Sequence, residues 1–232
     1  MTFPRRLEPE LLDQLPADDP RAVGARRDLK RVNGWMRNAN CMAALLRAHA
    51  GTRQPRTILD LGSGDGALML EVARRLAPHW RDVRVILLDQ QNIVSATTRE
   101  NFGALQWQAE AVSADVFDYL SRAPSGSVDV ITANLFLHHF TDEQLSRLFA
   151  KAAELAWLVV ACEPRRAKFV VELSRMLWTI GCNEVTVHDA VASARAGFAN
   201  NELSALWPKQ GWGLQERAAL VFNHTFVARR AA

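Results

Sequence analysis

From residue 57 onward, short apolar runs alternate with segments whose apolar residues recur at helical spacing. The pattern predicts strands over residues 57–61, 83–89, 105–111, 128–133 and 157–162, and helices over residues 67–76, 92–102, 141–153 and 168–181. Strands that are apolar almost throughout are typical of a parallel sheet with both faces covered. We therefore expect a doubly wound, Rossmann-like α/β fold.

The two ends of the chain depart from this alternation. Residues 213–220 and 222–229 are strand-like neighbours, which predicts an antiparallel pair at one edge of the sheet. Residues 8–20 predict a short helix and a loop, and residues 21–50 predict one or two amphipathic helices. The expected architecture is an N-terminal helical extension (residues 1–50) followed by a core with a mostly parallel, seven-stranded sheet (residues 51–232), whose C-terminal strand is antiparallel.

Composition narrows the class of protein. Apolar residues make up 49% of the chain and charged residues 23%, a balance that excludes a disordered or fibrous chain. The longest apolar runs are too short to cross a bilayer, and the first residues do not form a secretion signal, so we expect a cytoplasmic protein with no membrane partner. The three cysteines have no CxxC spacing, so we expect neither a metal site nor a disulfide framework.

The net charge of +3 is unevenly spread. Residues 1–57 carry 11 Lys/Arg against 6 Asp/Glu, and the rest of the chain has a small acidic excess. No long basic run occurs, and few aromatic residues lie between the basic ones. A solvated helix face is therefore favoured over a nucleic-acid site.

The most specific motif is the segment ILDLGSGDG (residues 58–66), a strand that ends in closely spaced glycines. Glycines there let the backbone approach a ligand and turn into a helix. Gly62, Gly64 and Ala67 also satisfy the GxGxxA pattern of dinucleotide-binding oxidoreductases, which remain an alternative. However, Asp60 lies inside the strand, where a carboxylate would repel a pyrophosphate but can receive a cationic amine.

Acids recur at the ends of the next two predicted strands. Asp89 comes 23 residues after Gly66, near the spacing expected of a carboxylate that binds ribose hydroxyls. Asp115 follows the third strand and can accept a hydrogen bond from an adenine amine. Because ligand-binding groups gather at the carboxyl ends of parallel strands, these acids predict one nucleoside-binding site.

Together the segments ILDLGSGDG, VILLDQ, SADVFD and VDVITANLFLHHF resemble class I S-adenosylmethionine-dependent methyltransferases, over about residues 57–165. The resemblance implies S-adenosyl-L-methionine as cofactor and S-adenosyl-L-homocysteine as product. It implies that Gly62, Gly64 and Gly66 lie under the methionine part of the cofactor and that Asp60 faces the amino group of the cofactor. The other implied cofactor contacts are Asp89 at the ribose, Gln90, Asp115 and Val116 at the adenine, and Asn134 near the sulfonium.

The segment after the fourth strand bears on the substrate. It lacks the Asn/Asp-Pro-Pro-Tyr/Phe motif of enzymes that methylate adenine bases or glutamine amides. Instead, the run from Leu137 to Glu143 (LHHFTDE) resembles the L-H-D-W-S-D-E run of small-molecule O-methyltransferases, which implies His138 as general base. Similar histidine pairs occur in quinone-type C-methyltransferases. A substrate-lid insertion is expected at about residues 182–208, where His188 is the second candidate base.

The resulting functional prediction is methyl transfer to a hydroxyl of a small aromatic or polyketide-like molecule in secondary metabolism. A looser likeness to bacterial polyketide-pathway methyltransferases favours that substrate class. A ring C-methyltransferase and a non-catalytic S-adenosylmethionine-binding accessory protein remain alternatives, and an RNA methyltransferase is disfavoured. The expected partner is the small molecule, with no nucleic acid, and the expected state is a monomer or homodimer.

Overall fold

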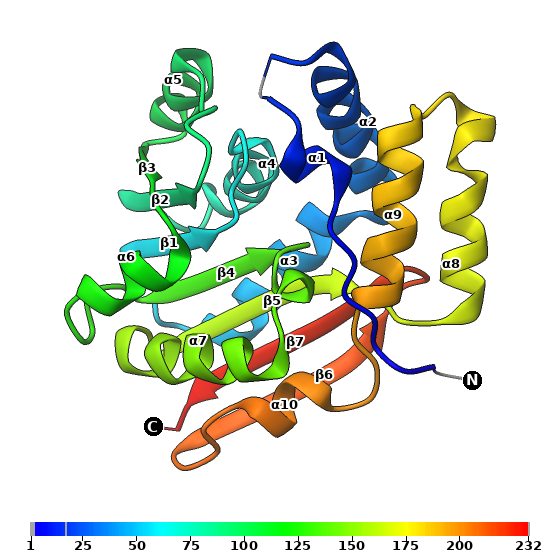
Figure 1. The fold of residues 1–232 in the computed structure, drawn as a ribbon. Coiled ribbons are helices and arrows are strands. Elements are labelled where there is room, and N and C mark those ends of the chain that lie inside the picture. The colour runs from blue at the N-terminus through cyan, green and yellow to red at the C-terminus, as the bar shows by residue number, and fades with distance from the viewer. Residues whose placement is uncertain (1–2, 17, 232) are drawn as a thin grey trace.

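In the computed structural model, which describes residues 3–16 and 18–231, the chain builds one sheet in the order β3-β2-β1-β4-β5-β7-β6 (Figure 1). The strands are β1 (Thr57–Leu61), β2 (Val83–Asp89), β3 (Trp107–Ser113), β4 (Val130–Asn134), β5 (Leu158–Pro164), β6 (Trp212–Ala219) and β7 (Asn223–Arg230). The first five pair in parallel, and β7 is antiparallel to both of its neighbours. The predicted Rossmann-like fold is thus confirmed.

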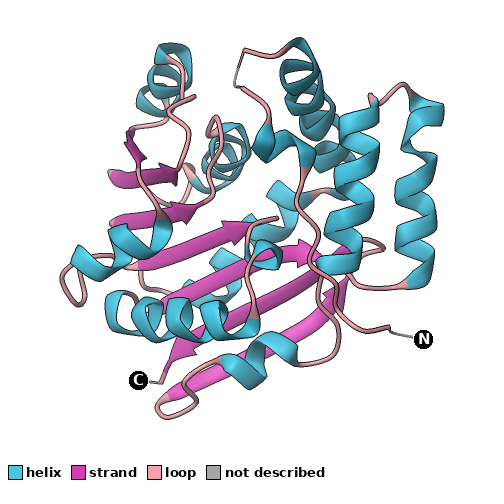
Figure 2. Cartoon of the chain, in the orientation of Figure 1, coloured by secondary structure: helices cyan, strands magenta, loops and turns pink. Residues whose placement is uncertain are grey.

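Helices cover both faces of the sheet (Figure 2). They are α1 (Leu11–Gln14), α2 (Pro20–Met36), α3 (Asn38–Ala50), α4 (Ala67–Leu76), α5 (Ala96–Ala104), α6 (Val116–Arg122), η1 (Leu137–His139), α7 (Asp142–Leu155), α8 (Lys168–Arg175), η2 (Met176–Ile180), α9 (Glu184–Ala196) and α10 (Glu202–Leu206). No helix in the described part of the chain has the length and apolarity needed to cross a membrane.

Alternation along the strands divides the core into two layers. In β1, Leu59 and Leu61 face the side covered by α6, α7 and α10, whereas Ile58 faces the side covered by α3, α4 and α5. Successive side chains of a strand point to opposite faces, so a buried strand such as β1 or β2 supplies both layers. Phe149 of α7 and Phe102 of α5 are fully buried on the two sides. The sheet is therefore fixed from both faces, which holds its strand ends in place.

The carboxyl ends of β4 and β5 point toward a group of helices made by α1, α2, α8, η2 and α9 (Figure 1). These helices pack mainly on one another: α9 contacts α1, α2, α8 and η2. Helices α1 and α2 come from the N-terminal region and the others from residues 168–196, and together they lie beyond the strand ends, where ligands bind in this type of sheet.

A few boundaries differ from the sequence pattern. The third strand begins at Trp107 rather than at residue 105, because Leu105 ends α5 and Gln106 takes a left-handed conformation (φ 60°). Helix α6 was not predicted: it has only 7 residues, and the Asp115 carboxylate caps it by accepting from the backbone N–H groups of Phe117 and Asp118. The expected lid (residues 182–208) contains α9, with 13 residues, and α10, with 5 residues.

Candidate active site

Two cavities meet beyond the strand ends. The larger, here called the polar cleft, has a volume of about 900 Å³ and lies along the glycine loop and α2. The smaller, here called the apolar cavity, has a volume of about 290 Å³ and lies among α2, α8, η2 and α9. The residues common to both linings are Glu10, Leu12, Leu29, Leu135 and Ser193. The two cavities therefore adjoin, and a group bound at their junction touches both.

The glycine loop forms one wall of the polar cleft. Gly62 has φ 66°, and a Cβ there would lie 2.2 Å from the ring of Phe136, so no other residue fits without rearrangement. Gly64 has φ 56°, and no atom lies within 4 Å of the position that its Cβ would take. Its backbone N–H donates to Asp89 Oδ2 over 2.8 Å. The loop thus leaves open space that suits a ligand pressed against the backbone.

Asp60 is a buried carboxylate at the bottom of the polar cleft. Its Oδ1 accepts a hydrogen bond from Thr132 Oγ1 over 2.6 Å. Burial, together with the nearby charge of Asp89, raises the pKa of Asp60 to about 7 despite that hydrogen bond. No cation among the described residues neutralises it, so a bound ammonium group would favour its ionised form.

Asp89 ends β2, lines the polar cleft and links two segments of backbone. Its Oδ2 accepts from Gly64 and its Oδ1 accepts from the N–H of Gln91, over 2.8 and 2.9 Å. Each carboxylate oxygen has a further lone pair, so Asp89 can also accept from a diol.

The three residues expected at the adenine lie together at the ends of β2 and β3. Gln90 Nε2 donates to Asp115 Oδ2 over 3.3 Å, and Val116 begins α6. None of the three lines the polar cleft as it stands.

Asn134 ends β4 and lines the polar cleft. Its Oδ1 is buried and has no hydrogen-bond partner among the described residues, and the same is true of Ser63 Oγ in the glycine loop. An unpaired buried oxygen costs free energy, so these atoms indicate where a ligand completes the structure. The residues around the cleft therefore fit a cofactor with an amino group and a ribose.

Helix α2 carries the basic residues of the N-terminal region to the polar cleft. Arg26 Nη2 donates to Gln91 Oε1 over 3.1 Å, and Lys30 Nζ pairs with Asp65 over 2.5 Å. Both cations line the cleft, together with Arg37 at the end of the helix. Part of the basic excess seen in the sequence thus faces this cavity.

His138 lies in η1, just after Asn134, and is buried between two carboxylates. Its Nδ1 is 2.8 Å from Glu163 Oε2, and its Nε2 is 3.3 Å from Glu10 Oε1. Burial alone would lower the pKa of His138, but its hydrogen bonds to Glu10 and Glu163 outweigh burial and raise the pKa to about 9. Glu163 also accepts from the backbone N–H groups of residues 136–138, which fixes its position. Glu163 therefore orients the imidazole, and Nε2 faces the junction.

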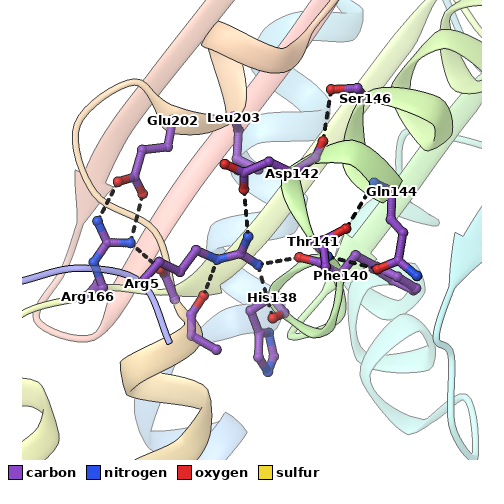
Figure 3. A network of polar contacts seen from close by, with 12 residues as sticks. Arg5, His138, Phe140, Thr141, Asp142, Gln144, Ser146, Arg166, Glu202 and Leu203 are labelled. Atoms are coloured by element: carbon purple, nitrogen blue, oxygen red, sulfur yellow. Dashed lines mark hydrogen bonds and ion pairs between the residues drawn. The ribbon is translucent and has the colours of Figure 1, made fainter. Parts of the chain in front are cut away.

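Glu10 reaches His138 because the segment of residues 3–14, here called the N-terminal strap, crosses the junction. Arg5 anchors the strap: its guanidinium donates to the carbonyls of His138, Phe140 and Ala196 and pairs with Asp142 (Figure 3). Farther along the strap, Glu10 hydrogen-bonds to Ser193 of α9. The strap thus closes the junction from outside.

His188 lies elsewhere. Its side chain is 45% exposed, its Nδ1 is 2.9 Å from Asp189 Oδ1, and it lines neither cavity. The structure therefore brings His138, but not His188, to the place where the cavities meet.

The junction also holds a group of potential metal ligands. Ligand atoms of Glu10, His138 and His139 all lie within 4.8 Å of one another. Two imidazoles and a carboxylate are donors that suit Zn²⁺ or Fe²⁺. In the structure, the hydrogen bond between His138 Nε2 and Glu10 Oε1 accounts for one of these contacts.

Sequence reasoning missed Glu10 and Glu163. Glu163 is the residue after Cys162 in the fifth strand, and an acid at the end of an apolar strand is the signal that indicated Asp60 and Asp89. Glu10 gave no such signal, because its role depends on the path of the strap.

Comparison with known proteins agrees with this geometry. Residues 58–156 match the family model described as a methyltransferase domain. A curated relative, the tRNA1(Val) (adenine(37)-N6)-methyltransferase of Shewanella halifaxensis, is 30% identical over 92 residues, 39% of this chain. The chain spans about a third (35%) of the length of that relative.

Solved structures of methyltransferases share the fold. An O-methyltransferase family protein from Burkholderia thailandensis has a TM-score of 0.62 at 16% identity, over 93% of this chain and 61% of its own. The plantazolicin methyltransferase BpumL, in complex with S-adenosylhomocysteine, has a TM-score of 0.64 at 15% identity, over 94% of both chains. The mitomycin 7-O-methyltransferase MmcR has a TM-score of 0.60 at 22% identity, over 95% of this chain and 60% of its own.

The structural likenesses establish the fold, and the family model covers the glycine loop, the acids at the strand ends and His138. Residues 58–156 therefore match a methyltransferase domain, within a fold that the chain shares with solved methyltransferases.

Proposed function

We propose that this chain binds S-adenosylmethionine in the polar cleft and transfers its methyl group to a hydroxyl of a small aromatic or polyketide-like molecule bound in the apolar cavity. The observation that carries the proposal is the junction of the two cavities, with His138 directed toward it by Glu163. The shared fold of an O-methyltransferase family protein and of the mitomycin 7-O-methyltransferase supports it.

On the cofactor side, Asp60 would accept from the amino group and Asp89 from the ribose hydroxyls. Gln90, Asp115 and Val116 would contact the adenine, and the unpaired Oδ1 of Asn134 supports a place beside the sulfonium end. Carboxylates also favour a ligand that carries positive charge. Bound S-adenosylmethionine would supply a methyl group attached to a cationic sulfur, and that sulfur is a good leaving group because it departs as a neutral thioether.

On the acceptor side, His138 would take the hydroxyl proton. A base must be neutral to do so, and the pKa of about 9 means that His138 is protonated at neutral pH while Glu10 stays beside it. An acceptor hydroxyl at the junction would take the position opposite Nε2 that Glu10 now occupies. Displacing that carboxylate would lower the pKa of His138 toward the range of a general base. His188 has no part in this arrangement.

Two alternatives use the same cavities. Removal of a phenolic proton also activates a ring carbon, so a C-methyltransferase would have the same base. Product analysis separates O-methylation from C-methylation.

The tRNA-modifying relative suggests a nucleic-acid acceptor. The apolar lining of the smaller cavity instead favours a small molecule, since it offers few polar partners to a nucleotide.

The test is calorimetric titration with S-adenosylhomocysteine, using Asp89→Ala and, as control, Glu100→Ala on the exposed surface of α5. We expect wild type and the control to bind and Asp89→Ala to lose at least tenfold in affinity, because it loses two ribose hydrogen bonds and the support of the glycine loop. Binding of NADH without binding of S-adenosylhomocysteine would overturn the proposal.

Phenolic acceptors are then screened for methyl transfer, with His138→Gln expected to be inactive. Added chelator tests the metal alternative: lost turnover would assign Glu10, His138 and His139 to an ion.

A further inference from the structure

The apolar cavity is lined mainly by apolar side chains. Its walls come chiefly from α2, α8, η2 and α9 and include Leu29, Val32, Val170, Leu173, Leu177 and Ala194. Several polar side chains of the lining already bond to the protein. Asp189 accepts from the backbone N–H groups of Leu11 and Leu12, and Thr186 bonds to Asn183. They leave a ligand few polar partners over most of the cavity.

Two further polar side chains lie at the inner end. Glu10 and Ser193, which hydrogen-bond to each other, belong to the part of the lining that the cavity shares with the polar cleft. A molecule that fills the cavity therefore meets hydrogen-bonding groups at the junction and hydrocarbon farther out.

The outer end of the cavity opens onto exposed apolar side chains. Trp35 is 58% exposed, Met176 is 55% exposed and Ile180 is 39% exposed, and all three also line the cavity. Trp178, beside them in η2, is 67% exposed. Large apolar side chains that cluster at the mouth of a cavity mark a surface that an apolar partner covers. Here the exposed cluster is continuous with the wall of the apolar cavity. A ligand that fits the cavity and also covers the cluster is therefore one continuous hydrocarbon chain.

We propose that the methyl acceptor is an amphiphile, in which a hydroxyl-bearing ring lies at the junction and a hydrocarbon tail runs through the apolar cavity to its rim. This inference rests on the proposed function for the identity of the head group. A volume of about 290 Å³ is at the lower end for small-molecule sites. A long tail therefore extends beyond the cavity, where Trp35 and Met176 cover it.

The test measures binding and not turnover, so it is independent of the proposed chemistry. Para-cresol, para-pentylphenol and para-nonylphenol are titrated into the protein with and without S-adenosylhomocysteine, below the concentration at which they aggregate. Each methylene buried in the cavity is expected to tighten binding by about fourfold. The gain per methylene should become smaller once the tail reaches the rim.

Two variants locate the tail. Ala190→Phe places a ring in the cavity from α9 and should remove most of the gain between para-cresol and para-pentylphenol. Ala150→Phe, on the exposed face of α7, is the matched control and should keep it. Met176→Ser should reduce only the additional gain of para-nonylphenol. Circular dichroism and S-adenosylhomocysteine binding verify that each variant is folded.

Equal affinities for the three phenols would overturn the inference, as would a chain-length gain that Ala190→Phe leaves intact. Sedimentation gives the remaining outcome: if the rim is buried between two copies of the chain and the phenols do not bind, the exposed cluster is a dimer interface and the tail site is wrong. Failure to bind S-adenosylhomocysteine, with the phenol series intact, would count only against the proposed function.

Discussion

His138 shows how the charge around one side chain decides what it can do. With Glu163 on Nδ1 and Glu10 on Nε2, both ring nitrogens carry protons at neutral pH, and the pKa of His138 is about 9. The two carboxylates have different surroundings: Glu163 is fully buried and held by three backbone N–H groups, whereas Glu10 belongs to the strap. Glu163 is therefore fixed as the orienting group, and Glu10 is the partner that an acceptor can displace.

The pH profile of Glu10→Gln follows from this difference. Below its pKa His138 is protonated and cannot act as a base, so kcat/KM should rise with pH and level off near the pKa. Removing the charge of Glu10 lowers that pKa, because one of the two groups that raise it is lost. The rising limb should therefore move to lower pH by about one unit or more. Glu143→Gln, exposed at the start of α7, is the control, and an unmoved limb in Glu10→Gln would exclude His138 as the base.

At the scale of elements, local pattern predicted most of the fold. The first five strands were found because each was predicted from a short apolar run between helical segments, and the glycines and Asp60 mark the end of the first strand. Helix α6 was missed because it is short and depends on the cap at Asp115. The contact between Glu10 and His138 could not be predicted, since it joins residues 128 positions apart through the path of the strap.

Arg5 is one of the residues that hold the N-terminal strap in place, beside the contacts that Leu11, Leu12 and Glu10 make with α9. Its guanidinium is largely buried, bonds to two carbonyls beside η1 and one at the end of α9, and lies over the ring of Phe198. Arg5→Met should free the strap and leave those carbonyls without a donor, at a cost of about 1–3 kcal/mol. We expect faster proteolysis within residues 3–14 and a shift of the pH profile in the same direction as in Glu10→Gln. Arg6→Met is the control, because the Arg6 side chain is 73% exposed. Equal protease resistance of the two variants would show that Arg5 does not anchor the strap.

At the scale of the whole molecule, the sequence suggested an extension over residues 1–50 that precedes the core. The structure divides that region differently. The strap and α2 pack on α9 and close the cavities, whereas α3 packs against α4 and β5 as part of one core layer. Met42 and Leu46 of α3 are completely buried, and Leu45 nearly so. The part that can be removed without opening the core thus ends well before residue 50.

Truncation tests this division. Burying three such side chains stabilises the fold by about 5–9 kcal/mol, which is comparable to the whole stability of a typical domain. A chain that begins at residue 51 should therefore fail to show cooperative unfolding in urea. A chain that begins at residue 15 loses only the strap and should unfold cooperatively, with S-adenosylhomocysteine binding retained, since the glycine loop, Asp60 and Asp89 are intact. If residues 51–232 alone unfold in a cooperative transition and bind S-adenosylhomocysteine, α3 is an appendage and the N-terminal region is a separable extension after all.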